Sequence, residues 1–299
     1  MNVHALIKIT RRRYSYLIVL LCLYILPQLS IAQTPIDSLL IAEAHWQEKT
    51  LKPGITWRQA HFENLFESQQ EINLLEIDLS VPERRLAFVG LSQDLKLTSE
   101  FAREADALGA INATFFDTKL GGSVTFLKIN KQIVNETSLL LPNGANHERA
   151  NGALIMNGQE ASIVIGVDQT IGWDKQLPAD HVMVCGPTLL HGGAEILLQK
   201  NAFNDNRHPR SAVGLTADNK IILLTVDGRN ALAHGMNLHQ LAFLLRVMDV
   251  QDALNLDGGG STTLYIKGEN HSGVVNYPSD NKAFDHDGER KVANAILVF

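Results

Sequence analysis

The sequence predicts a mixed α/β fold, α+β in character, with mixed β-sheets and few helices in a single compact domain. Short apolar segments bounded by turn residues recur along the chain, as strands do. Two segments, 98–108 and 238–247, instead have the apolar spacing of amphipathic helices. No low-complexity linker interrupts residues 33–299, which are enough for one large domain.

The first 32 residues have the three parts of a secretory signal peptide. A basic segment that ends at Arg13 precedes an apolar run at 17–26, and Ser30-Ile31-Ala32 is a small-x-small cleavage site. The apolar run is well short of the ~20 residues that span a bilayer. We therefore expect cleavage after Ala32 and a secreted or periplasmic protein without a stable membrane span. An uncleaved N-terminal anchor is the alternative.

Charge and cysteine content limit the partners and the source of stability. The whole chain has a net charge of −6, and loss of the four basic residues before position 33 leaves 22 basic against 32 acidic residues, or −10. This balance disfavours nucleic acid or an anionic membrane as the main partner. Cys185 is the one thiol left after cleavage, so no internal disulfide can form and stability must come from the core.

Residues 33–70 are interpreted as an N-terminal extension, and residues 71–299 as the main domain. The extension begins with helical spacing at 36–46, which ends before Pro53-Gly54. The first strands are expected at residues 57–66, 72–79 and 85–89.

Turn signals divide the rest of the main domain. A helix over 98–108 ends at Gly109, and a strand over 110–116 runs into Asp117. Three pairs of strands flank the turns Asn130-Lys131, Asn157-Gly158 and Asp218-Asn219. The remaining elements are expected at residues 181–185, 238–247, 253–256, 264–266 and 292–299.

The most informative motif is a strand that delivers a carboxylate into three consecutive glycines. Its residues are Asp257, Gly258, Gly259, Gly260, Ser261 and Thr262. Three glycines cost backbone entropy that a simple turn does not require, and they suit a backbone that approaches a ligand and points N–H groups at it. The alternative is a glycine-rich hairpin in which Asp257 caps its own turn.

A second segment resembles this motif and suggests an internal pseudo-repeat. The earlier unit reads helix, Ala110-Ile111-Asn112, Asp117 and Gly121-Gly122-Ser123; the later unit reads helix, Ala253-Leu254-Asn255, Asp257 and Gly259-Gly260-Ser261. If the repeat is real, the two Asp loops face each other across one cleft and supply the carboxylate pair that glycoside hydrolysis uses. A chance match of short segments is the alternative.

Other candidate residues lie at strand ends. Arg210 and Arg229 suit a bidentate grip on phosphate, and Asp227 ends a strand as Asp257 does. Asn112, Phe116 and His234 are candidates for sugar contacts. Each has a structural alternative: a solvated ion pair, an Asx turn, a packed ring or a loop histidine.

No cofactor is expected. The histidines form no His-x-His or His-Glu-x-x-His pattern, and no Lys follows the glycines as it does in a P-loop. A divalent cation on the Asp loops is an alternative that no ligand motif supports.

Several segments in order resemble the phosphodiester glycosidase family across roughly residues 70–299. The segments are 109–117, 207–214, 225–229, 235–238, 255–263 and 290–295. The resemblance implies a sugar–phosphate diester substrate and a mixed α/β fold. The chain lacks the cysteine-rich extension and membrane span of animal members, and the sugar is not implied.

Together these features predict a secreted hydrolase that splits a sugar-1-phosphodiester into free sugar and phosphomonoester. Asp257 is the expected base or nucleophile, with Asp227 or Asp117 as its partner, while Arg210, Arg229 and the glycine N–H groups hold the phosphate. Two alternatives are a phosphodiesterase that cleaves the P–O bond and a secreted carbohydrate-binding protein without turnover.

Overall fold

The computed structural model describes residues 35–166 and 172–299. The predicted signal peptide lies outside these residues. None of the helices in the described ranges is long and apolar enough to cross a bilayer.

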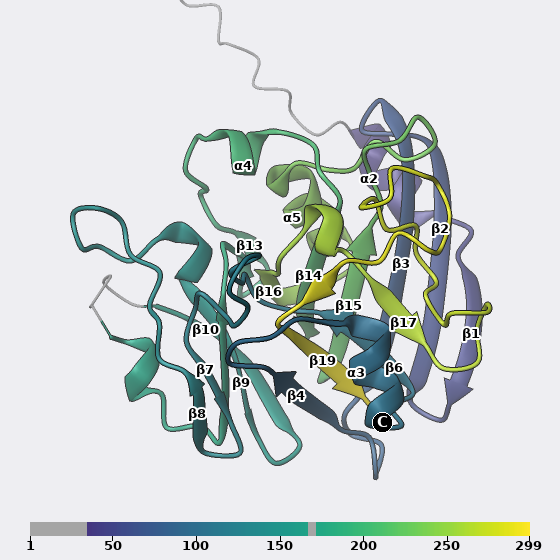
Figure 1. Cartoon of the computed structure of the whole chain (residues 1–299). Helices are drawn as coiled ribbons and strands as arrows, with labels where there is room; N and C mark the ends of the chain where they lie inside the picture. The colour runs from purple at the N-terminus through teal and green to yellow at the C-terminus, as the bar shows by residue number, and fades with distance from the viewer. Residues whose placement is uncertain (1–34, 167–171) are drawn as a thin grey trace, which may run out of the picture.

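The described chain forms four antiparallel sheets (Figure 1). The eight-stranded sheet has the order β1-β2-β3-β15-β14-β16-β12-β13. Its strands are β1 (Gln47–Lys52), β2 (Ile55–Leu65), β3 (Ser68–Asp78), β15 (Lys220–Val226), β14 (Arg210–Thr216), β16 (Val250–Asn255), β12 (Thr188–His191) and β13 (Ala194–Glu195). Strands from residues 47–78 and 188–255 therefore meet in one sheet, and β14, β15 and β16 bring Arg210, Asp227 and Asp257 to the same region.

Three smaller sheets complete the β structure. One contains β10 (Glu160–Ile165), β9 (Gly152–Asn157), β11 (His181–Cys185), β7 (Leu127–Ile129) and β8 (Gln132–Asn135), in that order. Another contains β17 (Leu264–Ile266), β6 (Gly109–Asn112), β19 (Asn294–Val298) and β4 (Leu86–Gly90). The smallest pairs β18 (Lys291–Val292) with β5 (Lys96–Leu97).

Helices are few and short. The α-helices are α2 (Pro35–Ala42), α3 (Thr98–Glu104), α4 (Ala202–Asp205) and α5 (Leu238–Val247). The 3₁₀ turns are η1 (Glu148–Ala150), η3 (Asp174–Gln176) and η4 (Gly259–Ser261). Asn237 caps α5, because its side chain accepts the N–H of Gln240.

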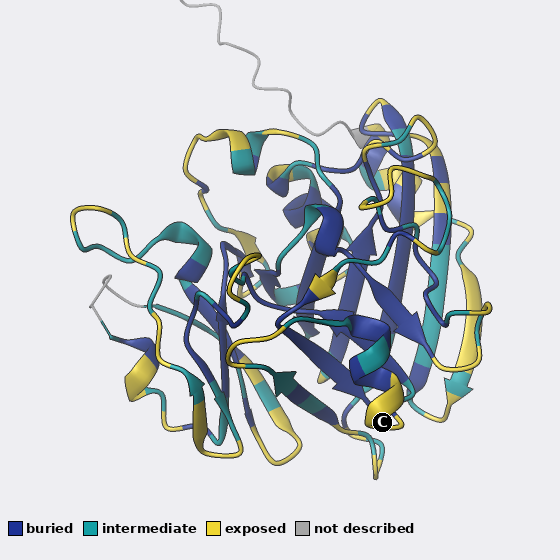
Figure 2. Cartoon of the chain, in the orientation of Figure 1, coloured by how far each residue is buried: buried dark blue, intermediate teal, exposed yellow. Residues whose placement is uncertain are grey.

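Two clusters of apolar side chains cover the faces of the eight-stranded sheet, and its central strands are drawn as buried in Figure 2. On one face Leu75 and Leu223 pack in a cluster with Ile111, Ile296 and Leu154 of the smaller sheets. On the other face, the apolar side of α5 packs against β12 and β16, in a cluster that also includes side chains of β2, β3 and β15. Burying both faces holds the strand ends in fixed positions, which is the requirement for a preorganised site.

The structure corrects the predicted fold class. The fold is largely β, rather than mixed α/β, because every strand pair in the described residues is antiparallel and the helices are short. Antiparallel neighbours can be joined by tight turns, so the chain does not need a crossover helix after each strand. The predicted hairpin turn at Asn130-Lys131 is present, with both residues at positive φ.

The segment interpreted as an N-terminal extension contributes strands to the main sheet. Helix α2 covers residues 35–42, so it begins one residue before the predicted segment 36–46 and ends four residues earlier, and β2 pairs with β3 along most of its length. Ile55 and Leu65 of β2 are fully buried, so this segment packs as part of the domain core.

Candidate active site

The backbone of Asp257 is anchored on both sides by the strand β6 region. Its N–H donates to the carbonyl of Ala113 at 2.7 Å, and its carbonyl accepts from Nδ2 of Asn112 at 2.7 Å. The two units of the predicted pseudo-repeat therefore meet through Asn112 and the Asp257 loop.

Asn112 holds this loop from beneath. Its side chain is fully buried, and its Oδ1 accepts from the Ser211 hydroxyl at 2.7 Å and from the Thr263 N–H at 3.1 Å. These contacts place the amide as a support for the loop, whereas the sequence suggested direct contact with a sugar.

The glycines let two arginines approach the loop closely. Gly259 has φ of +64°, and a Cβ there would lie 2.9 Å from Nη2 of Arg229. A Cβ on Gly260 would lie 2.6 Å from both Nη2 of Arg290 and Oδ1 of Asp280. A side chain at either position would therefore displace the neighbouring guanidinium group from its place over the loop.

The N–H groups of the three glycines are not all available to a ligand. Gly258 donates to Oδ1 of its own neighbour Asp257 at 3.0 Å, and Gly259 donates to the carbonyl of Pro209 at 2.8 Å. The hydroxyls of Ser261 and Thr262 are buried and lack a hydrogen-bond partner of good geometry in the described residues. Both hydroxyls belong to the loop that follows Asp257, and the Ser261 hydroxyl lowers the pKa of Asp257 against the larger effect of burial.

Asp257 is half-buried, and its carboxyl is enclosed by the loop. Burial raises the pKa of Asp257 to about 6, against the opposing effects of the nearby Ser261 hydroxyl and the Gly258 N–H. The guanidinium groups of Arg290 and Arg149 also lower this pKa. A carboxyl that titrates near neutrality beside cations is suited to accept a proton from water.

Arg149 is a member of the site that sequence reasoning missed. It lies in η1, where the N–H of Arg149 donates to the His147 ring. Its guanidinium lies 4.0 Å from the ring centroid of Phe203 and 5.6 Å from that of Phe115. No motif surrounds Arg149 in the sequence, and only the fold brings η1 beside the Asp257 loop.

Arg290 and Arg229 differ in their partners. Nε of Arg290 donates to Oδ1 of Asp280 at 3.0 Å. Arg229 is exposed and makes no hydrogen bond or ion pair with another described residue. Arg229 therefore has a free guanidinium over the glycine loop, in keeping with the predicted anion contact.

The structure places the Arg210 side chain in the protein interior. It is 1% exposed, and it donates to the carbonyls of Met236, Phe203 and Asn206 at 2.7–2.9 Å. Burial, with Arg149 and Arg229 nearby, lowers the pKa of Arg210 to about 9. Arg210 thus ties α4 and the loop before α5 to β14 while adding positive charge behind the site.

Asp227 lies at the end of β15 and is joined to the glycine loop through Asn276. Nδ2 of Asn276 donates to Oδ1 of Asp227 at 2.8 Å and to the carbonyl of Thr262 at 3.1 Å. Asp227 is 1% exposed, and its Oδ2 has no hydrogen-bond partner in the described residues. Burial raises the pKa of Asp227 to about 7, which favours the protonated acid.

The remaining predicted residues lie at the edge of this group or outside it. Oδ1 of Asp117 accepts the N–H groups of Lys119 and Leu120, as an Asx turn does, and these bonds lower the pKa of Asp117. Phe116 lines a hollow of about 490 Å³ that Arg290 also lines. His234 is exposed, and its backbone pairs with Gln69.

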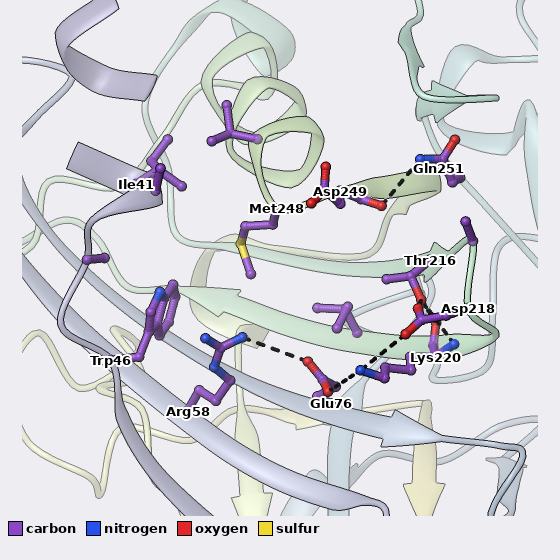
Figure 3. Close-up of a pocket in the computed structure, with 15 residues that line it drawn as sticks. Ile41, Trp46, Arg58, Glu76, Thr216, Asp218, Lys220, Met248, Asp249 and Gln251 are labelled. Carbon is purple, nitrogen blue, oxygen red and sulfur yellow. Dashed lines mark hydrogen bonds and ion pairs between the residues drawn. The ribbon is translucent and has the colours of Figure 1, made fainter. Parts of the chain in front are cut away.

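A separate hollow of about 660 Å³ lies between the end of α2, the end of α5 and the sheet (Figure 3). Its charged side chains pair with one another: Lys220 lies 3.1 Å from Glu76 and 3.2 Å from Asp218. It is at the opposite end of β14 and β15 from Asp227, a distance of about 20 Å for a seven-residue strand. This hollow is therefore distinct from the site that contains Asp227 and Asp257.

The site combines two carboxyl groups of raised pKa with three surface-facing or loop-facing guanidinium groups, from Arg149, Arg229 and Arg290. Such a set can bind a phosphate while moving a proton to and from a bond beside it. In the described ranges, no group of three or more His, Cys, Asp or Glu side chains could hold a metal ion.

Comparison with known proteins points to one family. A model of the phosphodiester glycosidase family matches residues 105–299. The mouse N-acetylglucosamine-1-phosphodiester alpha-N-acetylglucosaminidase is 42% identical over 71 residues, which are 24% of this chain and 13% of the mouse protein. The matched part thus spans about an eighth of that relative.

Solved structures share the fold. The catalytic domain of the zebrafish N-acetylglucosamine-1-phosphodiester alpha-N-acetylglucosaminidase, auto-inhibited by its pro-peptide, aligns with a TM-score of 0.63 and 19% identity, over 85% of this chain and 87% of that one. A hypothetical protein from Synechocystis aligns with a TM-score of 0.62 and 18% identity, over 85% of this chain and 63% of that one.

Proposed function

Because the chain belongs to the phosphodiester glycosidase family, we propose that it hydrolyses the glycosidic bond of a sugar-1-phosphodiester to free sugar and a phosphomonoester. The observation that carries this proposal is the Asp257 carboxyl, enclosed in a glycine loop that Arg229 and Arg290 approach. An anion-binding rim around a proton-accepting carboxyl fits a substrate whose leaving group is a phosphate ester.

Asp257 accepts the proton of the attacking water. With a pKa of about 6 it is largely ionised at neutral pH yet basic enough to take that proton. The water oxygen forms a bond to the anomeric carbon as the bond from that carbon to the phosphate oxygen breaks. A phosphomonoester is already a good leaving group, so the reaction depends more on charge stabilisation than on a strong acid.

Asp227 supplies a proton or a hydrogen bond to the departing oxygen. Its pKa of about 7 keeps it protonated when Asp257 is ionised. When their environments give two carboxyl groups of one site different pKa values, one group can act as the acid and the other as the base. The sequence-based alternative, Asp117 as the partner, is less well supported because its carboxyl caps its own turn.

Arg149, Arg229 and Arg290 bind the phosphate. The assignment of Arg229 has the strongest support of the three. Its guanidinium makes no hydrogen bond or ion pair with another described residue, and it lies over Gly259. Hydrogen bonds between guanidinium and phosphate are charge-assisted and directional, so they fix the diester while the sugar carbon faces Asp257.

The protein acts outside the cytoplasm in this proposal. The basic, apolar and small-x-small segments of residues 1–32 support export, and the net charge of −10 after cleavage supports a small or polymer-linked glycosyl diester over nucleic acid.

The proposal is tested by screening purified residues 33–299 against glycosyl-1-phosphodiesters for release of free sugar and phosphomonoester. Asp257→Asn preserves the shape of the side chain and removes the base, so turnover should fall by about 10²–10⁴-fold. Asp117→Asn is the matched control and should keep turnover. Near-normal turnover by Asp257→Asn would contradict the assignment, and sugar binding without product release would support a binding protein.

A further inference from the structure

The strand register places a second carboxyl beside Asp227. Strands β15 and β3 pair up to Val226 and Ile72, and the same register continued by one residue sets Asp227 opposite Glu71. The N–H of Asp227 donates to the carbonyl of Glu71 at 2.9 Å. Side chains directly opposite each other in an antiparallel pair point to the same face, with Cβ atoms roughly 4.5–5.5 Å apart.

Glu71 and Asp227 share an enclosed environment. Glu71 is 7% exposed and Asp227 is 1% exposed. Burial raises the pKa of Glu71, as it does that of Asp227, and the charge of Glu71 raises the pKa of Asp227 further. Two buried carboxyl groups this close do not ionise independently, because each charge disfavours the other.

His61 distinguishes the two carboxyl groups. Its Nδ1 lies 3.0 Å from Oε2 of Glu71, and this contact lowers the pKa of Glu71 against the effect of burial. Asp227 has no such ring partner; its Oδ1 accepts from the neutral amide of Asn276. The negative charge of the pair is therefore better stabilised on Glu71, and the proton on Asp227.

Three further groups face the pair. The Tyr277 ring stacks on His286 with centroids 4.5 Å apart, and burial, followed by the charges of Glu71 and Asp227, raises the pKa of Tyr277. His286 lowers the pKa of Glu71, and its Nδ1 lies 2.7 Å from the carbonyl of Asn276. On the outer side, Glu63 lies 3.6 Å from Nε2 of His61. None of these three groups sets a positive charge against Asp227, the second carboxyl of the pair.

We propose that Glu71, held by His61, is a positioning residue that keeps a negative charge opposite Asp227 and so makes Asp227 retain the proton used in the reaction. This inference rests on the proposed function for its catalytic meaning, since Asp227 is the acid there. The arrangement itself is a property of the folded protein and exists without substrate. Sequence reasoning missed Glu71 because it lies in the alternating pattern of an ordinary half-buried strand.

The direct test is a carboxyl ¹³C NMR titration of protein labelled at the Asp side chains. The signal that disappears in Asp227→Asn identifies Asp227. We expect this signal to titrate near pH 7 in the unmodified protein and about one pH unit lower in Glu71→Gln, because the neighbouring charge is gone. Glu63→Gln, which removes an exposed carboxyl from the same His61, is the matched control and should leave the titration unchanged.

Turnover provides a second readout. In Glu71→Gln the alkaline limb of the pH–rate profile should move to lower pH by the same amount, while the acid limb, set by Asp257, stays in place. If Glu71→Gln does not fold, His61→Gln replaces it; loss of the His61 contact shifts the shared proton toward Glu71, and the Asp227 signal again titrates at lower pH.

The outcomes separate the two proposals. An unchanged Asp227 titration in Glu71→Gln, or a rate lowered equally at every pH, would overturn the role of Glu71. A shifted titration in a protein that hydrolyses no glycosyl phosphodiester would support the coupled carboxyl pair and count against the proposed function alone.

Discussion

Replacing Asp227 by Asn should increase the stability of the folded protein at alkaline pH. Asp227 is 1% exposed, and its ionised form is held without a cation and with Oδ2 unpartnered in the described residues. Burial raises its pKa from 3.8 to about 7, so ionising Asp227 costs more in the folded state than in the unfolded state. Asn has the same shape and carries no charge.

The magnitude follows from the difference between the two pKa values. Between pH 3.8 and 7 the folded protein retains a proton that the unfolded chain has released, so the free energy of unfolding falls as pH rises through this window. Asp227 therefore costs about 1 kcal/mol at pH 4.5 and about 4 kcal/mol at pH 8.5. The new amide hydrogens cost about 1–3 kcal/mol at both pH values if they lack partners.

Urea unfolding at pH 4.5 and 8.5 measures this effect. The change in unfolding free energy caused by Asp227→Asn should be about 3 kcal/mol more favourable at pH 8.5 than at pH 4.5. Asp117→Asn is the control with the opposite sign: the turn N–H groups lower the pKa of Asp117, so its loss should destabilise at pH 8.5. An equal effect of Asp227→Asn at both pH values would refute the buried, protonated state of Asp227.

Three other predictions concern the arginines and the pH dependence of turnover. Arg229→Gln should raise KM by roughly 10- to 100-fold with a smaller change in kcat, because it removes charge-assisted hydrogen bonds to the phosphate; an unchanged KM in steady-state kinetics would place the phosphate elsewhere. Arg210→Met should lower the free energy of unfolding by about 3 kcal/mol or more, since three carbonyls lose their donor; urea unfolding with normal stability would show that those bonds are not structural. The pH–rate profile should be bell-shaped with its maximum between pH 6 and 7, rising as Asp257 ionises and falling as Asp227 does; a plateau above pH 8 would exclude Asp227 as the acid.

Local sequence patterns were enough to predict most elements of the fold. Helix α5 covers 238–247 as its apolar spacing predicts, and the hairpins around Asn130-Lys131 and Asp218-Asn219 form where the turn residues lie. The prediction of few helices was confirmed, but the prediction of a mixed α/β fold was wrong, because periodicity indicates that a strand is present but says little about its partner. Here distant segments such as β3 and β15 pair in antiparallel register, and the sheets need few helices to cover them.

The candidate site could be predicted where a motif marks it. The run from Asp257 to Thr262 predicts a close approach of the backbone to a ligand, and this stays a prediction; the groups that lie beside Gly259 and Gly260 in the structure are guanidinium groups of the protein itself. Arg149 and Glu71 carry no local signal, because each enters the site through tertiary packing or strand register. Arg210 lies at a strand end, which is why the sequence predicts that it binds phosphate. Its side chain instead turns inward to backbone carbonyls, and the position at a strand end does not determine this direction.

Hydrolysis in ¹⁸O-labelled water tests the central claim most directly, once a glycosyl phosphodiester that the protein cleaves is in hand. We expect the label to enter the released sugar at the anomeric carbon, because Asp257 directs water to that carbon. Label in the phosphomonoester would show that the P–O bond is the one broken, and would contradict the assignment of this site as a glycosidase.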